Sequence, residues 1–171
     1  MTTKVERIQR YPVSARALLG MLTDQQFFVA RFSMSGIDNY RFDTFEQQGS
    51  ELVIRVSRQV SLRPGNVPLF ARKFVGSSYV MTQEFIWTDM DSLPYRARYR
   101  FSVGNAPVDV TGFIEITEQD GEAQQYVRVN ISAHVPLVGN KIAALLAEKV
   151  ESGMDSDYRA TMRYIEENKL A

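Results

Sequence analysis

The C-terminal segment, from Pro136 to about Asn168, most constrains what this chain can fold into. Large apolar side chains recur there at steps of three and four, which places them on one stripe of a helix of about eight turns. Charged residues fall largely on the other side, so the helix is amphipathic and needs an apolar surface to pack against. The stripe consists of Ile142, Leu145, Leu146, Val150, Met154, Tyr158, Met162 and Ile165.

Strands supply that surface, because most of the chain before the helix alternates apolar and polar residues. The first predicted strand, residues 5–12, ends at Pro12, since a proline cannot continue a central ladder. Turn signals separate most of the later strands, and short connections require antiparallel neighbours. These later strands are predicted at residues 39–47, 51–62, 79–88, 95–103, 108–118 and 125–135.

The alternation gives each strand one apolar and one polar face. In residues 95–103, for example, arginines occupy positions 96, 98 and 100, whereas Tyr95, Tyr99 and Phe101 occupy the other face. Such strands are typical of a single sheet covered on one side. We therefore predict an α+β fold, in which a curved seven-stranded antiparallel sheet wraps around the long C-terminal helix.

Shorter helices are predicted between strands. Ser14 and Asp24 can each cap one after the first strand, and the second of these helices stops near Gly36. A further helix is predicted near residues 67–75, where apolar residues recur at i, i+3, i+4 and i+7. Structured insertions of this kind are often lids or partner-binding elements.

Composition excludes several function classes. The 171 residues suit a single domain, 1–171, and 20 basic against 20 acidic residues leave no net charge for a nucleic-acid footprint. The chain has no cysteine, no apolar run of the ~20 residues that span a bilayer, and no signal-peptide pattern at its N-terminus. We expect a cytoplasmic protein.

Candidate catalytic and metal-binding residues are few. His134 is the only histidine, and its strand parity places it on the polar face, which is typical of a solvated histidine. Asp89 and Asp91 lack the glycine and distal glutamate of a calcium loop and are interpreted as part of a hairpin turn. No nucleotide-binding or nucleophile-elbow motif occurs. We expect no metal, no cofactor and no catalytic residue.

Four short motifs, together with the order of the elements, resemble a known family. The motifs are Val67–Phe70 with Lys73–Gly76, Glu84 with Trp87, Gly104–Val108 with Gly112, and Pro136–Gly139. They look like the marks of the family named domain of unknown function 2505, in the START-like (SRPBCC) superfamily. That superfamily includes polyketide cyclases, pollen-allergen-like proteins and lipid-transfer domains.

The resemblance covers almost the whole chain and implies a helix-grip fold of order β-α-α-β-β-β-β-β-β-α. It also implies a cavity between the sheet and the long helix that holds an apolar ligand. Members of the family tend to carry an acidic residue soon after the start of the long helix, where this chain has Lys141-Ile142-Ala143.

Polar residues on the apolar strand faces are candidates for contacts inside such a cavity. An unpaired buried charge is very costly, so Arg58 must find a carboxylate, reach solvent, or contact a polar group of a ligand. Gln83 can supply a hydrogen bond in an otherwise apolar wall. The complete set of predicted cavity residues is Arg58, Phe70, Phe74, Gln83, Phe85, Trp87, Tyr95, Tyr99, Leu146, Val150 and Met154.

Three functions remain open at this point. The first is a carrier or sensor of a hydrophobic small molecule or lipid, with Phe70 and Phe74 on a lid. The second is an enzyme of the cyclase or hydrolase type, and the third is an interaction module that uses residues 63–78. The lack of a paired acid and base on the apolar face favours the first over the second.

Two local expectations concern packing. Gly153 falls on the apolar stripe of the long helix, where a glycine costs ~1 kcal/mol relative to alanine, so we expect the sheet or an aromatic ring to approach it. Glu84 shares the polar face with Arg96, Arg98 and Arg100 of the next strand, and we expect it to pair with one of them.

Overall fold

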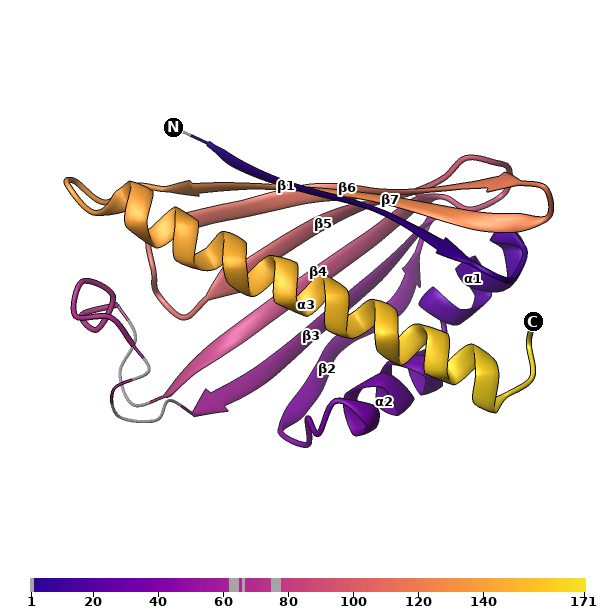
Figure 1. The fold of residues 1–171 in the computed structure, drawn as a ribbon, viewed down its shortest axis with the longest axis horizontal. Coiled ribbons are helices and arrows are strands. Elements are labelled where there is room, and N and C mark those ends of the chain that lie inside the picture. Colours follow the sequence, from indigo (N-terminus) through magenta and orange to yellow (C-terminus); the bar gives the residue numbers. More distant parts are fainter. Residues whose placement is uncertain (1, 62–64, 66, 75–77) are drawn as a thin grey trace.

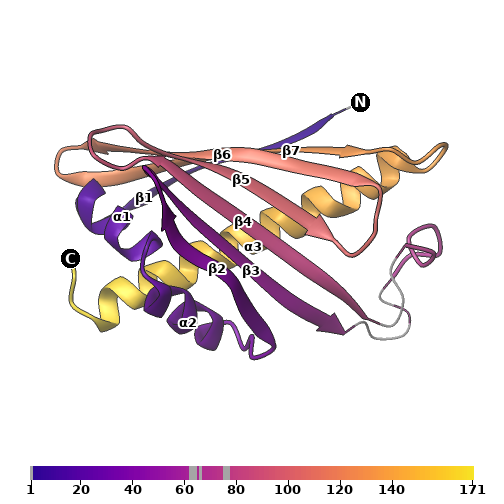
Figure 2. The same ribbon diagram turned by 180° about the vertical axis from the view of Figure 1, so that it is seen from behind.

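The described part of the chain forms one seven-stranded antiparallel sheet with its helices on a single face (Figures 1 and 2). This computed structural model describes residues 2–61, 65, 67–74 and 78–171. The strand order is β1-β7-β6-β5-β4-β3-β2, so the sheet is open, with β1 and β2 at its edges. The elements are β1 Thr3–Tyr11, α1 Ala15–Leu22, α2 Gln25–Met34, β2 Tyr40–Gln48, β3 Glu51–Ser61, β4 Ser78–Asp89, β5 Tyr95–Val103, β6 Val108–Gln119, β7 Glu122–Ala133 and α3 Gly139–Glu167.

The predicted helix-grip arrangement is confirmed. Strands β2 to β7 pair with their neighbours in sequence, as their short connections require. The long-range step is the pairing of β1 with β7, in which Val5 lies opposite Val129. This pairing bends the chain back on itself and brings its first strand beside α3, where Arg7 Nε lies 3.4 Å from Asp155 Oδ1.

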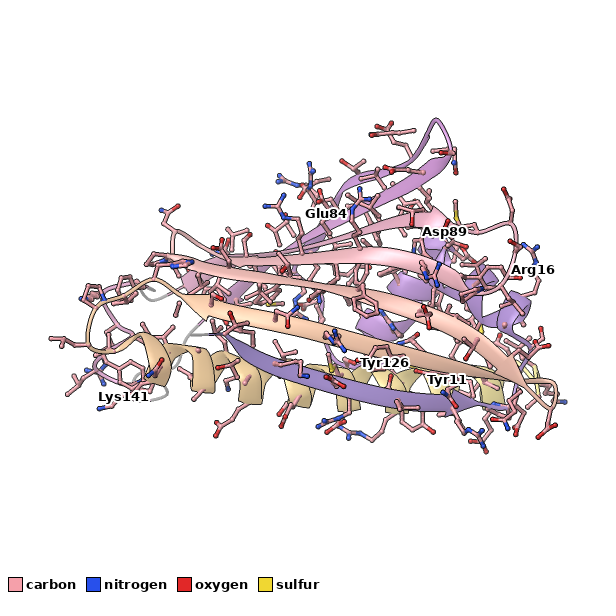
Figure 3. The ribbon with its side chains drawn as sticks, turned by 90° about the horizontal axis from the view of Figure 1, so that it is seen from above. Tyr11, Arg16, Glu84, Asp89, Tyr126 and Lys141 are labelled. Atoms are coloured by element: carbon pink, nitrogen blue, oxygen red, sulfur yellow. The ribbon has the colours of Figure 1, made fainter. Side chains whose placement is uncertain are left out.

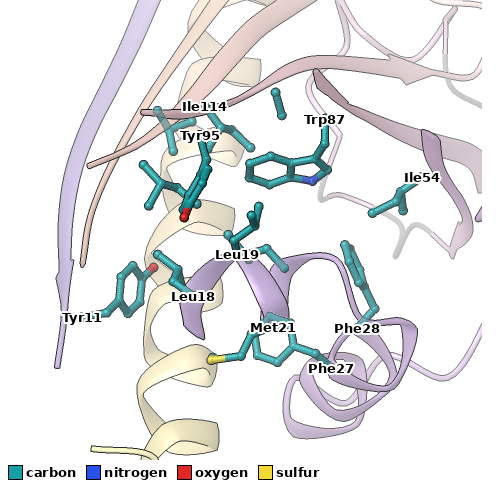
Figure 4. Close-up of a cluster of buried hydrophobic side chains, with 14 of the residues drawn as sticks. Tyr11, Leu18, Leu19, Met21, Phe27, Phe28, Ile54, Trp87, Tyr95 and Ile114 are labelled. Atoms are coloured by element: carbon teal, nitrogen blue, oxygen red, sulfur yellow. The ribbon is translucent and has the colours of Figure 1, made fainter. Parts of the chain in front are cut away.

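Helices α1 and α2 cover one end of the sheet. Each begins at its predicted cap: Ser14 Oγ accepts a hydrogen bond from Ala17 N at 3.1 Å, and Asp24 Oδ1 accepts one from Gln26 N at 3.0 Å. Their apolar sides meet the inner face of the sheet in a tightly buried cluster (Figure 4). This cluster includes Leu18, Leu19, Met21, Phe27, Phe28, Ile54, Trp87, Tyr95 and Ile114.

Helix α3 crosses the sheet diagonally and packs against β1, β7 and α2 (Figure 1). Its most buried residues lie near its two ends, with Ile142 and Ala143 at one end and Ala160, Thr161 and Ile165 at the other. The predicted apolar stripe is therefore only partly buried: its middle portion, residues 146–154, is half-exposed. Between these ends α3 lies against β1 on one side, where Gln9 Nε2 donates to Met154 O at 3.3 Å, and covers a hollow on the other.

The predicted helix near residues 67–75 is wrong. Residues 67–74 form consecutive turns whose backbone bonds join residues three apart, as from Ala71 N to Pro68 O at 3.0 Å. Bonds between residues three apart are typical of short, tight turns, which compete with a helix where so few residues are available to propagate it. Residue 75 and the predicted last residue of the 51–62 strand lie outside the described residues.

The pairing of β4 with β5 is confirmed, but Glu84 forms its ion pair elsewhere. Glu84 lies opposite Arg100 of β5 and opposite Arg55 of β3 on the outer face of the sheet (Figure 3). Its carboxylate accepts hydrogen bonds from Arg55, with the Nε–Oε2 distance at 2.9 Å. The pattern indicated the face correctly, but a central strand has two neighbours and the prediction considered only one.

We expect a double-mutant cycle on Arg55→Ala and Glu84→Ala to give a coupling of roughly 0.2–1 kcal/mol, the range for exposed pairs, because the Arg55 side chain is 46% exposed. Urea unfolding of the four proteins measures it. The matched cycle on Arg100→Ala and Glu84→Ala should give almost no coupling. A larger coupling to Arg100 than to Arg55 would contradict this assignment.

The expectation for Gly153 is also wrong. Gly153 is exposed, and a Cβ built there has no atom within 4 Å outside its own helix segment. Neither the sheet nor an aromatic ring approaches it, because it lies on the part of α3 that spans the hollow. The open space beside Gly153 is part of the cavity under α3.

Candidate functional site

A cavity of about 310 Å³ lies between α3, the end of α2 and the inner face of the sheet. Because α3 packs on β1, β7 and α2, it leaves a space above the part of β3 to β5 that α1 and α2 do not cover. The half-buried residues in the middle of α3 form its roof. The apolar walls include Phe28, Phe32, Phe85, Trp87, Leu146, Val150 and Met154.

The cavity communicates with solvent on the side of α3 that faces α2. Gly153 and Asp157 of α3 and Ser35 after α2 all line it, and all are exposed. The glycine at 153 keeps this region open, since any side chain there would occupy space in or beside the cavity.

One polar group in the wall is the pair Gln83 and Tyr99, from the adjacent strands β4 and β5. Gln83 Nε2 donates to the Tyr99 hydroxyl at 3.0 Å. Burial raises the pKa of Tyr99 well above its ordinary value, so the phenol stays protonated at neutral pH. Its O–H can therefore act as a hydrogen-bond donor, and it is poorly suited to act as a base.

Arg58 of β3 is the most unusual residue of the cavity. Its inward position follows from the strand register, in which it lies opposite Tyr40 and Met81. Its Nε is buried and has no hydrogen-bond partner in the described part of the chain, and its Nη2 has only Met81 Sδ, at 3.8 Å. Burial lowers the pKa of Arg58, while the charge of Asp157 raises it. An arginine nevertheless stays protonated in a protein.

A second polar group lies beneath α3 on β1 and β7. Gln9 Oε1 accepts a hydrogen bond from the Tyr11 hydroxyl at 3.3 Å, and Gln9 Nε2 donates to Met154 O at 3.3 Å. Gln125, beside Gln9 in the register, has a buried Oε1 without a partner among the described residues. Burial raises the pKa of Tyr11 well above its usual value.

Most of the predicted cavity residues do line the cavity. They come from β3, β4, β5 and α3. Alternation along the strands and the three-to-four spacing along the helix both predicted that these side chains point toward the space between sheet and helix. They are Arg58, Gln83, Phe85, Trp87, Tyr99, Leu146, Val150 and Met154.

Three predicted residues lie elsewhere. Tyr95 is on the inner face but is packed under α1, where Arg16 lies over its ring at 5.4 Å. Phe70 and Phe74 are in the turn segment 67–74. Phe74 borders a shallow depression on the outer face of the sheet, beside Val80 and Thr82. In this structure these two phenylalanines do not cover the cavity as a lid.

Sequence reasoning missed several cavity residues: Gln9, Tyr11, Arg31, Gln125, Lys149 and Asp157. Strand parity could have found Gln9, Tyr11 and Gln125, because they share a face with Val5 and Val129. Arg31 and Asp157 gave no such signal, since helix charges are normally solvated and only the approach of α2 to α3 brings them to the cavity.

The remaining titratable candidates, His134, Asp89 and Asp91, are exposed and do not line the cavity. His134 lies just beyond β7 on the surface, with its Nε2 2.8 Å from Asp109 Oδ2. Within residues 2–61, 65, 67–74 and 78–171, no group of three His, Cys, Asp or Glu side chains could hold a metal ion. Asp91 lies in the turn between β4 and β5, as predicted, whereas Asp89 is the last residue of β4 and pairs with Arg96 of β5.

Comparison with known families matches residues 6–165 to the family model described as Protein of unknown function (DUF2505). The chain belongs to this family. The comparison with curated proteins gives no match. Membership extends over all the elements that build the cavity, from β1 to the C-terminal part of α3, so this DUF2505 chain contains the whole helix-grip fold.

Solved structures with the same fold are distant in sequence. The aromatase/cyclase ZhuI from Streptomyces sp. R1128 is 13% identical, with 97% of this chain and 94% of that chain covered and a TM-score of 0.64. Ara h 8.0201 is 12% identical, with coverage of 96% and 98% and a TM-score of 0.63. Norcoclaurine synthase from Thalictrum flavum is 10% identical, with coverage of 95% and 88% and a TM-score of 0.56. These likenesses establish the helix-grip fold of this DUF2505 chain.

No helix in the described residues is both long enough and apolar enough to cross a membrane.

Proposed function

We propose that this protein binds a hydrophobic small molecule or lipid in the cavity beneath α3, as a carrier or sensor. The observation that carries the proposal is the cavity itself: about 310 Å³ with mainly apolar walls and a few polar side chains directed inward. Small-molecule sites typically have this composition and volumes of about 300–1,000 Å³.

An energetic argument supports an occupant. At ~24 cal/mol per Å³, an empty apolar space of about 310 Å³ would cost about 7 kcal/mol. That is comparable with the whole net stability of a typical domain, about 5–15 kcal/mol. The core under α1 and α2 is tightly packed by comparison, so the hollow is confined to the space under α3.

The structural relatives agree with this proposal. The norcoclaurine synthase structure is a complex with dopamine and hydroxybenzaldehyde, two small aromatic molecules. A second protein of this fold is named as an aromatase/cyclase. Binding is the part of these activities that we carry over, because burial keeps Tyr99 protonated and makes it a hydrogen-bond donor in the cavity wall.

The test uses Trp87, which is the only tryptophan, is 1% exposed and lines the cavity. Titration with decan-1-ol, decanoic acid, a sterol and an aromatic polyketide should change its emission saturably for at least one of them. Gly153→Leu should weaken that binding roughly tenfold or more, because the leucine side chain occupies space that the ligand needs.

The matched control is Gly20→Leu. Gly20 lies on the exposed side of α1 and does not line the cavity, and a Cβ added to it would meet no atom within 4 Å. Both substitutions should keep or raise the melting temperature, since glycine in a helix interior costs ~1 kcal/mol. Absence of saturable binding by every probe, with no ligand retained in native mass spectra, would overturn the proposed function.

A further inference from the structure

The cavity has a polar part whose charges the protein itself does not neutralise. Arg31 of α2 and Arg58 of β3 both line it, and in each the Nε is buried without a hydrogen-bond partner in the described part of the chain. A buried donor that loses water and gains no partner is destabilising, and more so when it carries charge. Two such arginines in one cavity need an explanation.

The surrounding side chains satisfy these guanidinium groups only in part. Arg31 lies over the rings of Phe27 and Phe28, at 4.9 and 5.3 Å from their centroids, which stabilises the face of the cation but not its in-plane N–H donors. Arg58 donates through Nη2 to a thioether sulfur at 3.8 Å, which is a weak acceptor.

Charge in the cavity wall is unbalanced as well. Among the described lining residues Arg31, Arg58 and Lys149 are cationic, and Asp157 alone is anionic. Asp157 is not within ion-pair distance of any of these three cations. The excess is local, because the whole chain has no net charge.

We propose that the ligand is an amphipathic acid, in which an apolar body fills the space under α3 and an anionic group, carboxylate or phosphate, accepts hydrogen bonds from Arg58, with Arg31 adding positive charge. An anionic oxygen is the partner that a guanidinium binds best in a dry site. The proposal rests on the proposed function, since it names the class of molecule that the cavity holds.

The test compares probes that share one chain and differ in the head group: decanoate, decyl phosphate and decan-1-ol. Trp87 emission reports binding. The wild-type protein should bind at least one of the two anions about ten- to a hundredfold more tightly than the alcohol, the range expected for a charge-assisted hydrogen bond. The anion that binds more tightly identifies the head group as carboxylate or phosphate.

Arg58→Met is the decisive variant, because methionine retains the apolar length of the side chain without its charge. It should fold and lose the preference for the anion over decan-1-ol. Arg58→Lys should recover part of it. The matched control is Arg55→Met, three residues earlier on β3 and on the outer face, which should keep the full preference.

The outcomes separate this inference from the proposed function. Equal binding of the anions and the alcohol by the wild type would overturn the inference and leave hydrophobic binding in place. An anion preference that survives in Arg58→Met would overturn the role of Arg58. Binding of none of the three probes, nor of the sterol or the polyketide, would overturn both.

Discussion

Gly112→Ala should lower the free energy of unfolding by roughly 3 kcal/mol or more. Gly112 lies in β6 between Tyr99 of β5 and Val129 of β7. A Cβ at this position would be 2.0 Å from Arg128 O and 3.0 Å from Val129 Cα, both backbone atoms of the neighbouring strand. Because backbone cannot rotate away as a side chain can, the β6–β7 ladder must shift.

Thermal unfolding followed by circular dichroism measures this effect, and a protein of this length should lose about 6–12 °C in melting temperature. Gly20→Ala is the matched control, since it makes the same chemical change on an exposed helix position with open space. It should be neutral or stabilising. A melting temperature of Gly112→Ala equal to that of the wild type would mean that β6 and β7 are not this close.

Phe27→Ala should cost roughly 3–5 kcal/mol, the usual range for removing a fully buried phenylalanine ring. Phe27 of α2 is 0% exposed, and its ring meets Tyr164 of α3 edge-on at 4.9 Å between centroids. The contact holds the C-terminal half of α3 against α2, which is also the side on which the cavity opens. The loss should therefore weaken ligand binding in addition to stability.

Urea unfolding gives the stability change, and Phe74→Ala provides a control with the same chemistry. Phe74 is half-buried in the 67–74 turns, beside the outer face of the sheet and away from the cavity. Phe74→Ala should therefore lower the free energy of unfolding much less than Phe27→Ala does, and it should leave ligand binding unchanged. Similar destabilisation by both variants would show that α2 does not anchor α3 through Phe27.

The secondary structure was predictable because its signals are local. Alternation at period two gave the strands, and the caps at Ser14 and Asp24 gave the starts of α1 and α2, since each depends on residues only a few positions apart. The prediction for residues 67–74 was wrong because it relied on apolar spacing alone, and a segment this short forms tight turns as readily as a helix.

The candidate site was predictable only in part. Parity placed Arg58 and Gln83 on the inner face, and helical periodicity placed Leu146, Val150 and Met154 of α3 at the cavity. Phe70 and Phe74 were assigned to a lid because their spacing predicts that they share one face. The spacing does not indicate which part of the protein that face contacts. Gly153 was misjudged for the same reason: the stripe continues through it, but a Cβ there would have no atom within 4 Å outside its own helix segment.

The sequence by itself determined the elements, the antiparallel order of β2 to β7 and the face on which each side chain lies, because periodicity and short turns are properties of neighbouring residues. Only the tertiary structure decided that β1 pairs with β7, that α3 is held at its ends over a hollow, and that Arg31, Arg58 and Asp157 border one cavity. These three residues come from α2, β3 and α3, and what brings them together is the packing of segments far apart in the chain, which no local pattern records.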